Sequence, residues 1–218
     1  MLDEAAREEM MRRLAARFPG RARSPQEGPG GKGGRNPFRS VVSCMLSAQS
    51  LDRNTAAATR NLFALARTPE GILALTDEEI TTAIRPAGLY NVKCRNLRKM
   101  CRHLIDELGG EVPRSRAGLM ALPGVGRKCA DIVLHFTFQE AVVAVDTHVH
   151  RVCNRTGLAE GKTEERTARS LDARIPDWAR WDAHVQILAF GKQVCRARAP
   201  KCDDCPLSDL CEFYAGAH

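Results

Sequence analysis

The sequence contains no long apolar run, and none approaches the roughly 18 consecutive apolar residues that a membrane-spanning helix needs. Its first residues, MLDEAAREEMMRRLAARF, carry too many charges for a secretory signal and suit an exposed helix instead. We therefore expect a cytoplasmic protein, associated with the nucleoid if its source is bacterial, and no membrane partner. Nine cysteines in such a reducing compartment are not expected to form disulfides.

Strand-like sequence is scarce as well, and there is no internal repeat. Only AVVAV, residues 141–145, has the pattern of a strand, and one short apolar run does not make a sheet. Elsewhere apolar residues recur at helical spacing, and a capping box of Thr76 with Glu79 and a stop at Gly109-Gly110 fit the same pattern. Helices are expected over residues 38–49, 54–66, 76–84, 96–108, 116–122, 127–136, 147–156, 164–175 and 178–190. The predicted fold class is all-α.

The charge balance is moderately basic, with a formal net charge of +7 and a pI of about 9.1. This balance is typical of proteins with a polyanionic partner, although many basic proteins bind no nucleic acid. Residues 19–38 are rich in Gly, Pro and Arg, a composition that buries little apolar surface. They are interpreted as a solvated loop or linker, with a charged tether that touches DNA as the alternative.

The strongest chemical signal is CRARAPKCDDCPLSDLC near the C-terminus. It holds Cys195, Cys202, Cys205 and Cys211, separated by six, two and five residues. Zinc sites usually pair two knuckles across a longer loop, whereas a compact set of four thiolates suits a cubane iron–sulfur cluster. We therefore expect a [4Fe-4S] cluster, with zinc as the alternative. The other cysteines fall on expected helices and are interpreted as core residues: Cys44, Cys94, Cys101, Cys129 and Cys153.

A second signal is LPGVGRKCADIVL, residues 122–134. Its turn contains Gly124 and Gly126, and the helix that follows begins with Arg127 and Lys128. Basic residues are unfavourable at the positive end of a helix, unless a phosphate lies beside them on the exposed backbone N–H groups. A helix–hairpin–helix of this kind is common in proteins that bind DNA without sequence specificity.

Further motifs accompany the hairpin: NPF, SAQ, GLYN, GGEVP, VDTH and RVCNRT, together with the four cysteines. With LPGVGRK they cover residues 36 to 214, and the whole resembles the endonuclease III family of helix–hairpin–helix DNA glycosylases. The resemblance implies a six-helix domain at residues 37–140 and a cluster domain at residues 141–218. Residues 1–36 are expected to form an N-terminal helix, which packs on the cluster domain, and a flexible Gly/Pro/Arg-rich segment. It also implies a monomer whose cleft between the lobes holds duplex DNA with a damaged base or an abasic site.

The resemblance assigns roles to individual residues. Lys128 is the expected amine nucleophile and Asp146 the expected carboxylate, while Gln49 and Leu89 are expected to fill the gap left by a flipped base. Phosphate contacts are expected from two groups, the hairpin and the cysteine segment: Gly124, Val125, Gly126 and Arg127, and Arg196, Arg198 and Lys201.

The chemistry of base excision requires a carboxylate and a neutral amine. The base must leave the stack before its glycosidic bond is accessible. A carboxylate stabilises the oxocarbenium-like sugar, and a neutral lysine attacks C1′ to give a Schiff base that permits β-elimination. A positive neighbour such as Arg127 favours loss of the lysine proton. The expected function is a glycosylase with lyase activity that excises oxidised pyrimidines.

Alternatives remain at the level of residues and of function. Lys128 is alternatively a phosphate contact, Asp146 a helix cap, Gln49 a polar helix-end residue and Leu89 a buried residue. The functional alternatives are a monofunctional mismatch or adenine-type glycosylase, whose members usually carry tyrosine or serine in place of the lysine, and a non-catalytic DNA-binding iron–sulfur protein. The chain departs from the usual family pattern at Ser50-Leu51, at Cys129 and in the Gly-rich stretch 28–35, which leaves its substrate range and turnover open.

Overall fold

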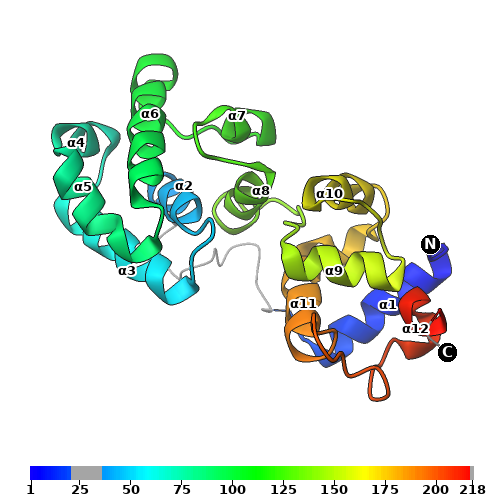
Figure 1. Ribbon diagram of the computed structural model, residues 1–218. Coiled ribbons are helices and arrows are strands. Elements are labelled where there is room, and N and C mark those ends of the chain that lie inside the picture. Colours follow the sequence, from blue (N-terminus) through cyan, green and yellow to red (C-terminus); the bar gives the residue numbers. More distant parts are fainter. Residues whose placement is uncertain (21–35, 217–218) are drawn as a thin grey trace. The chain divides into compact units, whose positions relative to one another are not determined.

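The computed structural model describes residues 1–20 and 36–216, and most of the expected linker lies outside the described residues. Every regular element in the described part is a helix (Figure 1). None of these helices is both long and apolar enough to cross a membrane. The described residues form two compact units, which we call the hairpin unit (residues 36–139) and the cysteine unit (residues 1–20 and 140–216).

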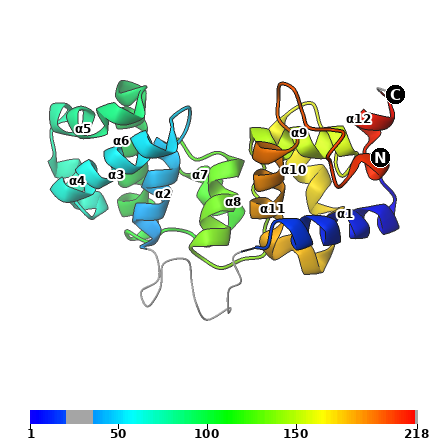
Figure 2. The same cartoon turned by 90° about the horizontal axis from the view of Figure 1, so that it is seen from below.

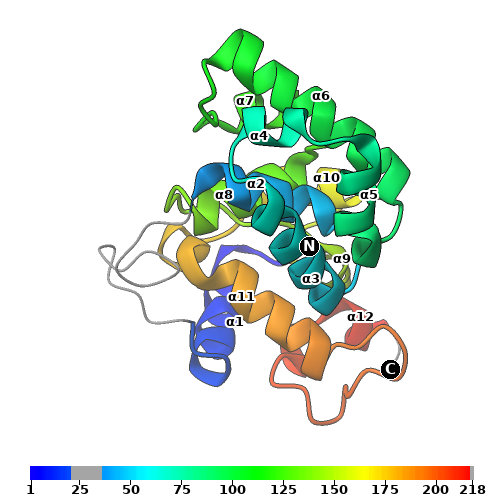
Figure 3. The same cartoon turned by 90° about the vertical axis from the view of Figure 1, so that its left-hand side faces the viewer.

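The hairpin unit is built from helices whose apolar faces pack on one another, with α2 against α3 and α8 and with α4 against α6 (Figure 3). Its helices are α2 (Pro37–Leu46), α3 (Asp52–Leu65), α4 (Pro69–Ala74), α5 (Asp77–Ile84), α6 (Tyr90–Leu108), α7 (Arg116–Ala121) and α8 (Arg127–Phe136), with the short 3-10 helix η1 (Arg85–Ala87) between α5 and α6.

Local sequence signals set the helix ends in this unit. The Thr76 side chain accepts from the Glu79 amide and the Glu79 carboxylate accepts from the Thr76 amide, so the capping box is formed. Helix α6 ends at Gly109, whose φ of 60° lies in the left-handed region that glycine adopts without a Cβ clash. The capping box and the glycine stop predicted from sequence are therefore confirmed.

The cysteine unit combines the two ends of the chain. Its helices are α1 (Glu4–Arg17), α9 (Thr147–Thr156), α10 (Glu164–Asp172), α11 (Arg180–Gln193) and α12 (Glu212–Ala215), with the 3-10 helices η2 (Asp177–Ala179) and η3 (Ser208–Leu210). Figure 2 shows α1 beside α11, which it contacts. Met10, Met11 and Leu14 of α1 are fully buried in a core shared with α9 and α11. The N-terminal helix therefore folds on the C-terminal segment.

The last three residues of the AVVAV stretch, 143–145, are buried, but the stretch forms no strand. Val143 and Val145 lie in the core of the cysteine unit, with 2 % exposure each. The carbonyl oxygen of Ala144 lies 2.8 Å from Nδ1 of His184 on α11. A side chain therefore provides the hydrogen-bond partner that a neighbouring strand would provide in a sheet. The strand-like pattern reflects burial on both sides of an irregular segment.

Candidate functional site

The hairpin between α7 and α8 turns on Gly124. Its φ is 82°, and a Cβ there would lie 3.1–3.2 Å from Asn96 and Met45. Gly126 has an ordinary φ of −93°, so of the two hairpin glycines only Gly124 has a left-handed backbone. A Cβ on Gly126 would meet open space, which leaves the N-terminus of α8 accessible.

In the rest of the hairpin, Val125 stabilises the turn, whereas the first backbone amides of α8 are accessible. Val125 is buried, and its amide donates to the Leu122 carbonyl at 3.1 Å, so both its side chain and its backbone serve the turn. The first intrahelical bond of α8 runs from the Ala130 amide to the Gly126 carbonyl at 3.0 Å. The amides at the start of the helix therefore point outward, as an anion site requires.

Arg127 lies in an ion pair within the hairpin. Its Nε is 3.5 Å from Oδ2 of Asp131, one turn further along α8, and Asp131 is fully buried. Arg116 of α7 approaches the other oxygen, with Nε 2.6 Å from Oδ1. One buried carboxylate thus connects α7 to α8, and it offsets the positive charge that we expected Arg127 to place beside Lys128. Sequence analysis missed Asp131, although its i,i+4 spacing from Arg127 is a visible signal.

Lys128 is exposed in the first turn of α8, directly after the open position at Gly126. Its neighbour Cys129 is buried and Arg127 is half-buried. Of the three residues that begin the helix, Lys128 is the exposed one, and its amine is accessible to a ligand.

The two expected gap-filling residues share an unusual backbone. Gln49 has a φ of 52° and Leu89 a φ of 46°, both in the left-handed region that costs a non-glycine residue about 1–3 kcal/mol. Both side chains are exposed, and Leu89 retains 54 % of its accessible surface. The interpretation of Leu89 as a buried residue is therefore wrong.

A buried lysine connects the segments that carry these two side chains. Nζ of Lys93, on α6, donates to the Leu46 carbonyl and to the Ala87 carbonyl, each at 2.8 Å. Leu46 ends α2 three residues before Gln49, and Ala87 lies two residues before Leu89. Burial lowers the pKa of Lys93. Sequence analysis missed this residue, because its neighbours in the sequence do not distinguish it from the exposed lysine at position 99.

Asp146 caps α9 in the cysteine unit. Its Oδ1 accepts from the amides of His148 and Val149, each at 2.9 Å. Both bonds go to the same oxygen, so Oδ2 takes no part in the cap. The positive end of the helix also favours a negative charge at this position. A single carboxylate can thus cap the helix and present its second oxygen to a ligand.

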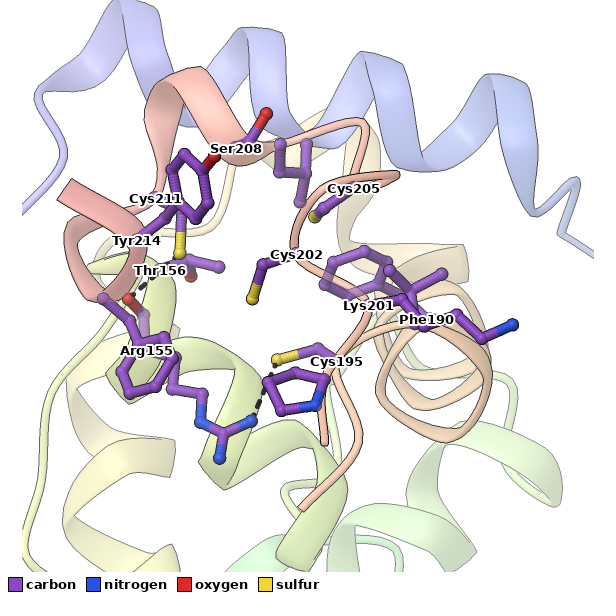
Figure 4. A pocket seen from close by; sticks show the side chains of 14 residues that line it. Arg155, Thr156, Phe190, Cys195, Lys201, Cys202, Cys205, Ser208, Cys211 and Tyr214 are labelled. Atoms are coloured by element: carbon purple, nitrogen blue, oxygen red, sulfur yellow. Dashed lines mark hydrogen bonds between the residues drawn. The ribbon is translucent and has the colours of Figure 1, made fainter. Parts of the chain in front are cut away.

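The four C-terminal cysteines line one cavity, toward which their side chains converge (Figure 4). All four are partly exposed. Within the described part of the chain, no three His, Cys, Asp or Glu side chains are spaced to hold a single metal ion. The four thiols instead surround a shared space, which suits a polynuclear cluster better than one zinc ion.

The electrostatics of the cavity also fit a bound cationic group. Burial raises the pKa of the Cys205 and Cys211 thiols, and the neighbouring cysteines raise it further. Cluster binding requires thiolates, and iron cations would supply positive charge that compensates them. The residues present therefore fit an iron–sulfur cluster.

Two arginines of α9 hold the segment of residues 195–211, which we call the cysteine loop. Arg151 donates to the carbonyls of Cys195 and Gly191 at 2.9 and 2.8 Å. Arg155 reaches the Arg196 and Ala197 carbonyls at 2.6 and 3.1 Å, and its Nη1 lies 3.6 Å from Sγ of Cys195. The helix that Asp146 caps at its start therefore organises the cysteines further along.

The basic side chains of the cysteine loop face solvent. Arg196, Arg198 and Lys201 are all exposed. The Lys201 amide donates to the Val194 carbonyl at 3.1 Å, which closes the segment between the first two cysteines into a loop. The loop therefore presents three cations on a short, backbone-bonded segment.

Comparison with known proteins identifies the family. Residues 42–177 match the HhH-GPD superfamily base excision DNA repair proteins, and residues 195–211 match the iron–sulfur binding domain of endonuclease III. The chain belongs to the HhH-GPD superfamily of base excision DNA repair proteins. The second match covers the cysteine loop, and the cofactor of this chain is a [4Fe-4S] cluster.

Individual relatives agree with this assignment. Endonuclease III of Escherichia coli (strain K12) is 43 % identical over 178 residues, which cover 82 % of this chain and 84 % of the relative. Endonuclease III of Thermotoga maritima is 36 % identical over 207 residues, covering 95 % and 92 %. A trapped covalent intermediate of endonuclease III with DNA, in an estranged-adenine complex, superposes with a TM-score of 0.85 at 37 % identity over 100 % of this chain and 99 % of that one.

These matches settle the class of activity. The HhH-GPD chain is a base-excision-repair DNA glycosylase with lyase activity, and it binds DNA. A thymine-DNA glycosylase structure also superposes, with a TM-score of 0.79 at 23 % identity, which supports the fold alone. The expected fold class, family, class of activity and cofactor are thus confirmed.

Proposed function

We propose that the chain acts as a monomer on duplex DNA in the cytoplasm, at oxidised pyrimidines and abasic sites, and that Lys128 is its nucleophile. The observation that carries the proposal is the exposed Lys128 in the first turn of α8, behind the open position at Gly126. An amine at this position can approach a sugar while the outward-pointing amides of the same helix bind the adjacent phosphate.

The proposed reaction begins with a base extruded from the stack. The exposed side chains of Gln49 and Leu89 occupy the vacated space and offset part of the cost of unstacking, which is a few kcal/mol. Their left-handed backbones, stabilised through Lys93, hold the side chains outward before DNA binds.

Bond cleavage is assigned to two residues. As the base leaves with the electron pair of its glycosidic bond, positive charge develops on the sugar, and the Asp146 carboxylate stabilises it. Oδ1 remains bound to the helix amides, so Oδ2 is the oxygen that acts. The neutral amine of Lys128 then forms a bond to C1′ and gives up a proton, and the C1′–O4′ bond breaks with protonation of O4′, which leaves a Schiff base. The Schiff base makes a C2′ proton acidic enough for loss of the 3′ phosphate.

The protein also holds a cluster through the cysteine loop. When bound, its iron–thiolate bonds close the cysteine loop, and no step of base excision is assigned to them. Arg196, Arg198 and Lys201 on that loop are proposed to contact DNA phosphates, because three exposed cations on a constrained loop are suited to a polyanion.

The substrate class is tested with duplexes that each contain one defined lesion. We expect base release and strand cleavage at thymine glycol, and cleavage at a ready-made abasic site. Release of a mismatched adenine, or of thymine from a G·T mismatch, without strand cleavage would favour a monofunctional glycosylase. The matched variant is Asp146→Asn, which keeps the capping oxygen and removes the charge: it should slow base release far more than it lowers thermal stability, and should spare the abasic site.

A further inference from the structure

Two cysteines outside the cysteine loop lie together beside Lys128. Cys44, on α2, is half-buried, and its thiol donates to the Cys129 carbonyl with an Sγ–O distance of 3.8 Å. Cys129 follows Lys128 directly in the first turn of α8 and is 8 % exposed. Helices α2 and α8 pack against each other, so residues 85 apart in the sequence are brought into contact.

One of the two thiols is accessible from outside. Cys44 lines a cavity of about 470 Å³ whose wall also carries Ser40, Ser43 and Ser47. Cys129 is absent from that wall and is buried. A small polar molecule that enters the cavity therefore encounters the Cys44 sulfur first.

The electrostatics of the pair separate the two thiols. A hydrogen bond with the Cys129 side chain lowers the pKa of Cys44, burial opposes this effect, and the positive charge of Lys128 lowers the pKa further. The pKa of Cys129 is raised by the same hydrogen bond and by burial. Cys101 and Cys153, which are buried elsewhere, have pKa values raised to about 12. Cys44 lines the cavity and has the lower pKa of the pair, so it is the thiol of the two that an oxidant in the cavity would attack first.

We propose that Cys44 and Cys129 form a redox-modification site, in which a hydroperoxide enters the cavity and oxidises Cys44, and Cys129 then closes a disulfide between α2 and α8. This site is distinct from the cluster and from the residues assigned to base excision. It consists of Cys129 on α8 and Cys44 on the neighbouring helix α2.

The two steps balance with the peroxide as the oxidant. The Cys44 thiolate forms a bond to one peroxide oxygen, the O–O bond breaks, and the other oxygen leaves as hydroxide and takes up a proton. Cys129 then loses its proton, and its thiolate attacks the Cys44 sulfenic acid. The S–O bond breaks, and hydroxide leaves with the Cys129 proton as water. With hydrogen peroxide as the oxidant, two thiols and one peroxide give one disulfide and two waters.

The disulfide would act on the proposed nucleophile. It fixes the backbone of Cys129 and ties the first turn of α8, which carries Lys128, to α2. This consequence rests on the proposed role of Lys128, whereas the disulfide itself does not. We expect Schiff-base formation to fall in proportion to the fraction of linked chains and to return on reduction.

Peptide mapping of the holoprotein tests the site. After peroxide treatment, alkylation of the remaining thiols and tryptic digestion, peptide 40–53 should be linked to peptide 129–151 and released by dithiothreitol. Cys44→Ser and Cys129→Ser should each abolish the link, and Cys101→Ser should not. A Cys44 that stays reduced, is oxidised without the link, or is linked only after the visible absorption of the cluster has disappeared would overturn the proposal.

A second measurement separates this proposal from the proposed function. Borohydride trapping on an abasic duplex should fall with linkage in the wild type and remain at its untreated level in Cys44→Ser. Linkage without a decrease in trapping would overturn the inhibitory consequence. Failure of the untreated wild type to trap at all would contradict the role of Lys128, while peptide mapping would still decide whether the two cysteines pair.

Discussion

Nζ of Lys93 donates to the carbonyl oxygen of Leu46 at 2.8 Å, so a cation buried under α6 caps the C-terminal end of α2. Its second bond, to Ala87, holds the segment that leads to Leu89. Gln49 and Leu89, which have left-handed backbones and are proposed to contact DNA, therefore both follow segments that Lys93 holds in place. The Lys93 side chain is only 4 % exposed.

Replacement of Lys93 by Met should cost about 1–3 kcal/mol in the free energy of unfolding, because two buried carbonyls lose their donor. Excision from a paired lesion should suffer more than cleavage of an abasic site, since only the paired lesion requires full unstacking. Lys99→Met, at an exposed position of the same helix, is the control for urea unfolding and nicking assays. Equal effects of Lys93→Met and Lys99→Met on stability and on excision would show that Lys93 does not hold these two segments.

The buried carboxylate of Asp131 should be a principal stabiliser of the hairpin. Asp131→Asn leaves two arginines beside a neutral side chain and should cost on the order of 3 kcal/mol in unfolding free energy. Glu165→Gln breaks an exposed pair with Arg169 and should cost less than about 0.5 kcal/mol. Urea denaturation measures the unfolding free energy of both variants. If Asp131→Asn costs as little as Glu165→Gln, the prediction is wrong, and water solvates the two arginines once the carboxylate charge is removed.

The basic cysteine loop should contribute to salt-sensitive binding of undamaged duplex. Arg196→Ala with Arg198→Ala should reduce the slope of log affinity against log salt by about 0.9 for each phosphate that the protein no longer neutralises. Arg12→Ala with Arg169→Ala removes the same charge from exposed helical pairs and should leave the slope nearly unchanged. Fluorescence anisotropy at several salt concentrations measures both. A slope unaltered in the loop variant would place the phosphate-binding residues elsewhere.

The cluster should depend on Arg155 as well as on the cysteines. Purified protein should be yellow-brown, with about four irons and four sulfides per chain. Arg155→Leu removes donors to Cys195 Sγ and to two loop carbonyls, and should lower iron retention and thermal stability. Arg7→Leu, on α1, is the matched control. Stoichiometric zinc without acid-labile sulfide, in protein prepared without air, would contradict the cluster assignment.

Local signals predicted much of this molecule. The capping box at Thr76, the glycine stop at Gly109 and the helical spacing each act within one turn, and the structure follows them. The cysteine spacing was informative for the same reason, because the four ligands lie within 17 residues.

The rest depends on contacts between distant segments. Lys93 and Asp131 look like ordinary helical residues until tertiary packing buries them. The AVVAV stretch has the composition of a strand, yet His184, 40 residues away, satisfies its backbone. The contact of Cys44 with Cys129 arises only when α2 packs on α8. Such pairings leave no periodic pattern in the sequence.

The most direct test of the central claim is borohydride trapping followed by mapping of the cross-linked peptide. On an abasic duplex the wild type should be trapped through Lys128, and Lys128→Gln should lose trapping and nearly all strand cleavage while it still binds DNA, because the hairpin backbone is unaltered. Lys99→Gln, at an exposed position of α6, should trap normally. Trapping of Lys128→Gln at the wild-type level, with the DNA attached to another amine, would contradict the account.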